Sequence, residues 1–149
     1  MMEYLETTVD KFIFKVAVDR YYNDEGVWAK PEGTLVRIGL SDFLQQRSGD
    51  VAFAEVKPEG TALAFGDEVA VIETIKVNIS LSSPVSGKIV EVNPDMEAAP
   101  EAINQDPYEK GWLALIETEN WKADLPRLLE ASAYFSRMKI EAEQEVKKG

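Results

Sequence analysis

Cysteine and histidine are both absent from this chain of 149 residues. Without cysteine the chain can form no disulfide bond, no thiolate nucleophile and no thiolate metal ligand. Without histidine it lacks the commonest general base and the commonest nitrogen ligand of zinc. Nucleophilic arrangements that pair serine or cysteine with histidine are therefore excluded. We expect any chemistry to be carried by an attached group rather than by the side chains of the protein.

Long apolar runs and an excess of basic residues are missing as well. No segment approaches the ~20 apolar residues that span a bilayer, and the first six residues are acidic where a signal peptide would be basic. The 16 basic and 27 acidic side chains give a net charge of −11, which repels nucleic acid phosphates and anionic lipid headgroups. We therefore expect a cytoplasmic protein that binds neither nucleic acid nor membranes.

Short stretches of alternating apolar residues predict a mainly β protein. The clearest lies at residues 11–18, where Phe12, Phe14, Val16 and Val18 fall on one face. Further strands are predicted at 34–38, 51–56, 68–73, 77–81, 88–92 and 113–116. Turn-forming glycines and prolines separate them, as between closely spaced antiparallel strands. The length suits one compact domain over residues 1–149, folded as a flattened antiparallel barrel or sandwich.

Helix signals are sparse until the C-terminus. Ser41 is a suitable N-cap for a short turn over 42–45, and residues 100–104 resemble another single turn. From about 128 to 147 the chain has no proline or glycine. Four apolar residues recur there at roughly helical spacing: Phe135, Met138, Ala142 and Val146. This pattern predicts a C-terminal α-helix that packs on its own domain along one stripe.

Lys76 lies between two strand-like runs, 69–73 and 77–81, so we expect it at the exposed tip of a hairpin. On spacing alone, the simpler interpretation is a solvated charge, which is the ordinary role of a lysine at the end of a strand. The neighbouring sequence favours a more specific role. The segment Glu73-Thr74-Ile75-Lys76 follows Gly66-Asp67-Glu68 and precedes Ser83-Pro84-Val85-Ser86-Gly87. This arrangement resembles the attachment region of the lipoyl and biotinyl carrier superfamily.

A wider resemblance is to one family within that superfamily, the H protein of the glycine cleavage system. Residues 38–43 and Gly49-Asp50-Val51 match its characteristic segments, as do the single residues Tyr22, Trp28 and Glu55. The most specific match is Asn104-Gln105-Asp106-Pro107-Tyr108 followed closely by Gly111-Trp112-Leu113. The resemblance covers roughly residues 22–134. The extra strand at 11–18 precedes this core, and the C-terminal helix extends beyond it.

The resemblance implies a lipoyl-type barrel-sandwich hybrid, or hammerhead, fold and a carrier role without an active site. Lipoic acid would be joined through an amide to Lys76, and its arm would shuttle a group or electrons between enzymes. Glu73 would help a lipoate ligase or lipoyl transferase to recognise the hairpin, and dihydrolipoamide dehydrogenase would be a further partner. Biotin acceptors usually have methionine on both sides of the lysine, whereas Lys76 lies between Ile75 and Val77. These neighbours favour lipoic acid over biotin as the attached cofactor.

The chain departs from the H-protein pattern at two places, and both departures bear on the cargo. Typical H proteins have a histidine where this chain has Gly26, and small residues follow the lysine where this chain has Val77-Asn78. These departures favour a paralogous branch, the lipoate-binding proteins that serve a heterodisulfide-reductase-like complex in sulfur oxidation. The alternative is the H protein of glycine cleavage, which carries an aminomethyl group.

Two other classes of function stay open at this point. One is an unmodified binding module that keeps the fold and does not need Lys76. The other is a hydrolase that uses the clustered carboxylates of Asp95, Glu97 and Glu101, although such a cluster is usually a solvated loop. The aromatic residues most suited to the core or to a cleft are Trp28, Phe43, Tyr108 and Trp112.

Overall fold

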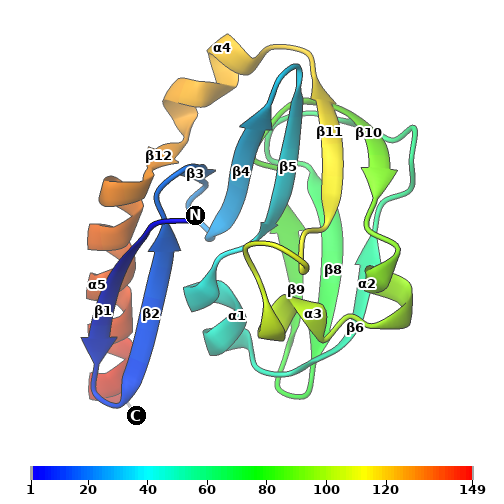
Figure 1. Ribbon diagram of the computed structural model, residues 1–149. Helices are drawn as coiled ribbons and strands as arrows, with labels where there is room; N and C mark the ends of the chain where they lie inside the picture. Colours follow the sequence, from blue (N-terminus) through cyan, green and yellow to red (C-terminus); the bar gives the residue numbers. More distant parts are fainter. Residues whose placement is uncertain (1, 149) are drawn as a thin grey trace.

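The computed structural model describes residues 2–148 and consists mainly of antiparallel strands, with one long helix at the C-terminus (Figure 1). The strands are β1 (Tyr4–Val9), β2 (Phe12–Ala17), β3 (Tyr21–Tyr22), β4 (Val27–Glu32), β5 (Leu35–Leu40), β6 (Val51–Val56), β7 (Ala62–Leu63), β8 (Glu68–Thr74), β9 (Asn78–Ser82), β10 (Gly87–Val92), β11 (Ala114–Thr118) and β12 (Leu129–Glu130). The helices are α1 (Asp42–Ser48), α2 (Asp95–Ala98), α3 (Ala102–Gln105), α4 (Trp121–Asp124), the 3-10 turn η1 (Leu125–Arg127) and α5 (Ala131–Lys148).

Two sheets share the main hydrophobic core. One has three strands in the order β6-β8-β9, and the other has seven in the order β12-β3-β4-β5-β11-β10-β7. Ile72 comes from the first sheet and Ile38, Ile89 and Ile116 from the second, and all four are fully buried in one cluster. Each such side chain contributes roughly 1.5–3 kcal/mol through burial. The predicted mainly β sandwich with a C-terminal helix is confirmed.

A separate two-stranded hairpin, β1–β2, precedes these sheets. Its register runs from Tyr4 opposite Ala17 to Val9 opposite Phe12, and Asp10 takes a positive φ of 57° in the turn. The strand predicted at 11–18 corresponds to β2. Its partner β1 was not predicted, because the covered face of β1, formed by Leu5, Thr7 and Val9, is interrupted by a polar threonine and so shows no clear apolar alternation. The hairpin packs against α5 and α1 around a second hydrophobic cluster.

The C-terminal helix begins later than the sequence pattern indicates. Leu129 and Glu130 pair as strand β12 with Tyr22 and Tyr21, so α5 starts at Ala131 rather than near 128. The buried side chains of α5 are Ala131, Tyr134, Met138 and Ala142. Two members of the predicted stripe differ: Phe135 is only partly covered and Val146 is 40% exposed. The stripe still packs on the same chain, against the β1–β2 hairpin.

Three of the four predicted core aromatics are buried, namely Trp28, Phe43 and Tyr108. The indole N–H of Trp28 donates hydrogen bonds to the carbonyls of Leu40 (3.0 Å) and Pro107 (3.1 Å), which ties β5 to the loop before β11. Trp112 is only partly buried. Within residues 2–148, no helix combines the length and apolar character needed to cross a bilayer.

Candidate functional site

Lys76 is exposed in the short turn that joins β8 to β9. Thr74 closes this turn: its hydroxyl donates to the carbonyl of Val77 (2.9 Å) and accepts from the backbone N–H groups of Lys76 (3.2 Å) and Val77 (3.0 Å). The side chain of Ile75 is 76% exposed. The structure thus places Lys76 at a hairpin tip, as the sequence predicts, and a threonine holds the backbone of that tip in one conformation.

The loop between α1 and β6 packs against the hairpin tip and supports it. The N–H of Ile75 donates to the carbonyl of Asp50 (3.1 Å). Gly49 has a positive φ of 92°, and a Cβ built on it would lie 3.2 Å from Cδ of Lys76. The aliphatic stem of the lysine therefore lies across the backbone of Gly49, where a larger residue would push it away.

Asn104, a residue of α3, holds this supporting loop in place through hydrogen bonds. Its amide group donates to the carbonyl of Gly49 (3.0 Å) and to the side-chain oxygen of Gln45 (3.0 Å). Its own oxygen accepts from the N–H of Val51 (2.9 Å). One side chain thus satisfies three groups around the loop on which Lys76 rests. The sequence motif at 104–108 pointed to Asn104, but not to this role.

We expect Asn104→Ala to lower the free energy of unfolding by about 1–3 kcal/mol, because it leaves Val51 N–H and the carbonyl of Gly49 without their partner. Urea denaturation of the purified chain measures this loss. The matched control is Asn78→Ala, because Asn78 is exposed beside the same turn. Equal losses in the two variants would contradict the role given to Asn104.

An open groove of about 420 Å³ lies beside the lysine. The side chain of Lys76 lines it together with Phe12 and Phe14 of the N-terminal hairpin, Phe43 of α1 and Val146 of α5. The β1–β2 hairpin therefore forms part of the immediate surroundings of the lysine. No sequence pattern indicated this contact, because more than 60 residues separate the two segments.

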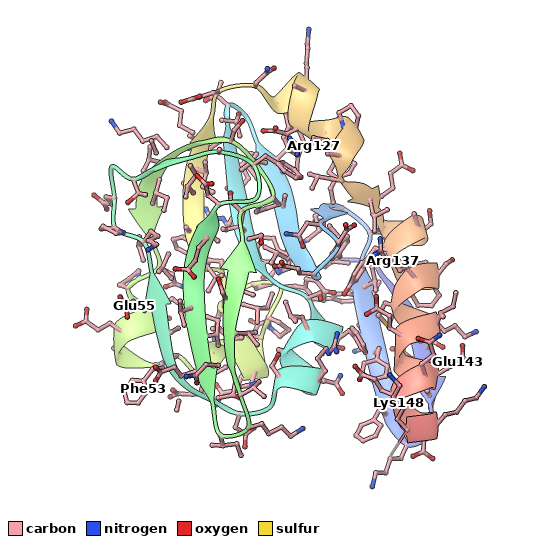
Figure 2. All side chains as sticks on the ribbon, turned by 180° about the vertical axis from the view of Figure 1, so that it is seen from behind. Phe53, Glu55, Arg127, Arg137, Glu143 and Lys148 are labelled. Carbon is pink, nitrogen blue, oxygen red and sulfur yellow. The ribbon has the colours of Figure 1, made fainter. Side chains whose placement is uncertain are left out.

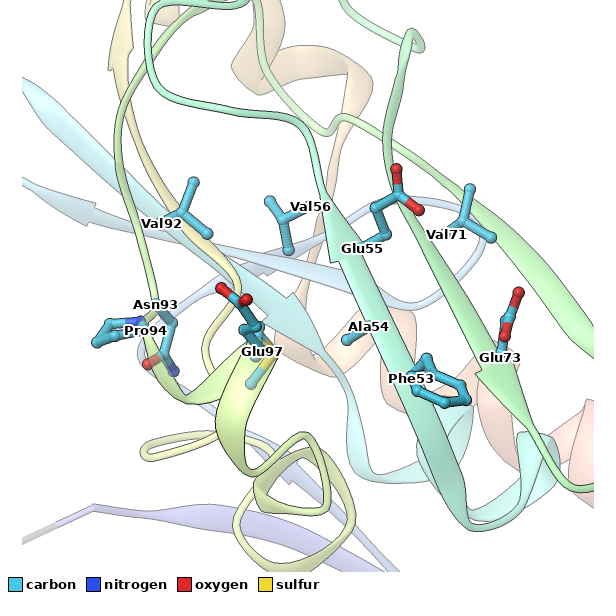
Figure 3. Close-up of a pocket in the computed structure, with 11 residues that line it drawn as sticks. Phe53, Ala54, Glu55, Val56, Val71, Glu73, Val92, Asn93, Pro94 and Glu97 are labelled. Carbon is cyan, nitrogen blue, oxygen red and sulfur yellow. The ribbon is translucent and has the colours of Figure 1, made fainter.

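Glu73 lies at the end of β8, exposed and three residues before Lys76. In the strand register it stands opposite Phe53 of β6, and both side chains line a second groove of about 710 Å³ (Figure 3). Asp95, Glu97 and Glu101 are also exposed, on α2 and just before α3. Among residues 2–148, no three carboxylates come close enough together to hold a metal ion.

Comparison with known proteins identifies the family. The model of the family described as glycine cleavage H-protein matches residues 20–141. The chain is 40% identical to the glycine cleavage system H protein of Anaeromyxobacter sp. (strain K), over 80% of this chain and 93% of that protein. It is also 40% identical to that of Thermus thermophilus, over 83% of this chain and 96% of that protein. The chain belongs to the glycine cleavage H-protein family.

Structural comparison agrees with this assignment. A crystal structure of the glycine cleavage system H protein from Mycobacterium marinum superposes with a TM-score of 0.70 at 30% identity, covering 80% of this chain and 96% of that one. The H proteins are carriers with lipoic acid attached covalently to a lysine, and they have no active site of their own. The predicted family, carrier class and cofactor are confirmed. The interpretation as a hydrolase has no support in these matches.

The comparisons also bear on the predicted cargo. They support the glycine cleavage alternative, and none of these H-protein relatives points to the sulfur-oxidation branch. The H-protein match begins at residue 20, so the β1–β2 hairpin precedes the region that matches the family model. The groove beside Lys76 therefore includes residues that the family model does not cover.

The structure gives Gly26 a packing explanation that is independent of cargo. Gly26 has a φ of +93°, and a Cβ on it would lie 2.7 Å from the hydroxyl of Tyr134 and 2.8 Å from that of Ser41. These two hydroxyls are hydrogen bonded to each other at 2.8 Å in the buried contact between α5 and the start of α1. The space for a side chain at position 26 is thus occupied by these hydroxyls. Packing explains the glycine, which therefore favours neither glycine cleavage nor sulfur oxidation.

Proposed function

We propose that this chain is lipoylated on Nζ of Lys76 and acts as the aminomethyl carrier of a glycine cleavage system. The observation that supports this most directly is the exposed lysine on a fixed hairpin tip in a member of the H-protein family. Within residues 2–148 the ammonium group of Lys76 makes no ion pair or hydrogen bond that would have to be broken before modification. The residues present therefore fit the cofactor.

The chain supplies the attachment point and its presentation. In attachment, Nζ of Lys76 attacks the carbonyl carbon of an activated lipoyl group, the new amide bond forms, the bond to the leaving group breaks and the amine loses a proton. When bound, the lipoyl group supplies the sulfur chemistry that a chain without cysteine lacks. Thr74, Gly49 and Asn104 hold the tip in place while the arm moves between partner enzymes.

We also propose that Glu73 contributes to recognition by the modifying enzyme, a lipoate ligase or lipoyl transferase. Its carboxylate is exposed at the end of the strand that leads to Lys76. The other partners that this function implies are the glycine cleavage enzymes and dihydrolipoamide dehydrogenase. The strongly acidic composition, with a net charge of −11, favours encounter with basic patches on such partners.

The test is transfer of the aminomethyl group from glycine. Purified lipoylated chain is mixed with glycine decarboxylase and labelled glycine, and the label on the peptide containing Lys76 is measured by mass spectrometry. The lipoylated H protein of Thermus thermophilus serves as the positive control. We expect label on the Lys76 peptide and release of carbon dioxide that depends on the chain. If the control protein accepts the aminomethyl group and this chain does not, the proposed role in glycine cleavage is wrong. That result would favour a carrier role in sulfur oxidation.

A further inference from the structure

A groove with an apolar lining runs along the edge strand β6, between β8 and the segment from the end of β10 to α2, near the hairpin that carries Lys76. Its apolar lining includes Val56, Val71, Val92 and Met96. Phe53 stands at its end and is 67% exposed. A phenylalanine exposed to this extent beside a groove is costly to leave in water, which is typical of a surface that another protein covers.

Three carboxylates surround this apolar lining, those of Glu55, Glu73 and Glu97 (Figure 3). Among the described residues, no lysine or arginine lines the groove. None of the three carboxylates forms a salt bridge with another residue between Met2 and Lys148, although Glu68 on the same sheet is paired with Lys57. A partner that fits this groove must therefore offer an apolar side chain with basic groups beside it.

The groove is continuous with the modification site. Phe53 pairs across the ladder with Glu73, and β8 ends one residue later at Thr74, which closes the turn around Lys76. A protein that binds over Phe53 therefore also lies beside the strand that leads directly to Lys76. Figure 2 shows Phe53 and Glu55 on the β6 side of the molecule, with α5 on the other side.

The chemistry at Lys76 indicates which partner needs this position. An enzyme that acylates the lysine must bring an activated carbonyl to bonding distance of Nζ, so it has to bind immediately beside the hairpin tip. Enzymes that act later meet the far end of the flexible lipoyl arm, and they can do so without contacting the strands beneath the lysine. The groove therefore suits the modifying enzyme better than the enzymes that use the arm.

We propose that the groove of β6, β8 and α2 is the docking site of the enzyme that acylates Lys76, with Phe53 as its apolar contact and Glu55, Glu73 and Glu97 as its charged contacts. This inference rests on the proposed lipoylation of Lys76. It assigns recognition to β6 and α2, which are remote in sequence from the lysine, in addition to Glu73. The enzyme contributes an apolar side chain flanked by lysine or arginine.

The experiment measures lipoylation of the unmodified full-length chain by a purified bacterial lipoate ligase with lipoate and MgATP, followed by intact mass. We expect Phe53→Ser and Glu55→Lys each to lower kcat/KM by about tenfold, because the first removes an apolar contact and the second replaces an attractive charge by a repulsive one. The change should lie in KM, because the reacting amine is untouched. Raising the salt concentration should slow modification of the unaltered chain more than that of Glu55→Lys.

Two substitutions on α5 provide matched controls, because they make the same chemical changes far from the groove. Ile140 is 57% exposed, and Ile140→Ser matches Phe53→Ser. Glu143 is exposed on the same helix, and Glu143→Lys matches Glu55→Lys (Figure 2). Both controls should be lipoylated at the rate of the unaltered chain. If the groove variants are modified as fast as their controls, the docking site is wrong while lipoylation stands. If the unaltered chain is not modified at Lys76, the proposed function fails with it.

Discussion

Replacing Lys76 by arginine should abolish both lipoylation and aminomethyl transfer, with no remaining activity above that of a reaction without the chain. Arginine keeps the positive charge and a long aliphatic stem over Gly49, so the hairpin should be preserved. Its guanidinium stays protonated in proteins and cannot form the amide that the cofactor requires. The assay is the glycine decarboxylase reaction with labelled glycine, run after incubation of each variant with lipoate ligase.

Lys88→Arg is the matched control for this variant. Lys88 is exposed at the start of β10 and lies outside the β8–β9 turn. It should be modified and loaded like the unaltered chain, which separates loss of one particular amine from a general effect of the substitution. Full activity of Lys76→Arg would contradict the carrier mechanism and favour the unmodified binding module, which keeps the fold without using this lysine.

Gly26→Ala should lower the free energy of unfolding by about 3 kcal/mol or more, which adds the cost of backbone strain to that of overpacking. The backbone at φ +93° disfavours any side chain, and the added Cβ would lie 2.7 Å from the hydroxyl of Tyr134 and 2.8 Å from that of Ser41. The hydrogen bond between those hydroxyls is buried, so displacing either oxygen leaves polar groups unpaired. Urea denaturation monitored by tryptophan fluorescence measures the loss.

Gly33→Ala separates the cost of backbone strain from the cost of overpacking. Gly33 also has a positive φ, of 68°, but nothing lies within 4 Å of a Cβ built there. Its substitution should cost about 1 kcal/mol from backbone strain alone. Introducing Tyr134→Phe into Gly26→Ala should recover part of the loss, because it removes one of the two crowded oxygens. Equal losses for Gly26→Ala and Gly33→Ala would contradict the packing explanation of this glycine.

Period-two patterns in the sequence predict most strands of the main core, but not β4 and β7, which contribute Val27, Ala29 and Leu63 to it. In β4, Pro31-Glu32-Gly33 resembles a turn, yet Pro31 lies within the strand opposite Val36. It is tolerated there because the neighbouring strand β3 pairs only with Trp28 and Ala29. Pro31 therefore needs no backbone N–H on that side.

Part of the candidate site could likewise be predicted from the sequence, and part could not. The motif around Lys76 and the spacing of the flanking strands were sufficient to place the lysine on a hairpin. The support beneath it could not be predicted, because Asn104 and Gly49 meet across 55 positions of sequence. Phe53 likewise looked like an ordinary member of a half-buried strand. Its exposure depends on which face of β6 the rest of the fold leaves uncovered.

Lipoylation of Lys76 is tested most directly by the intact mass of the chain purified from its native cells, with peptide mapping across residues 69–88. We expect one lipoyl group on the chain, confined to the peptide that contains Lys76. Lys88 lies within the mapped segment and should be unmodified. Native protein without any adduct, or with the adduct on another lysine, would contradict the central claim that this hairpin carries the cofactor.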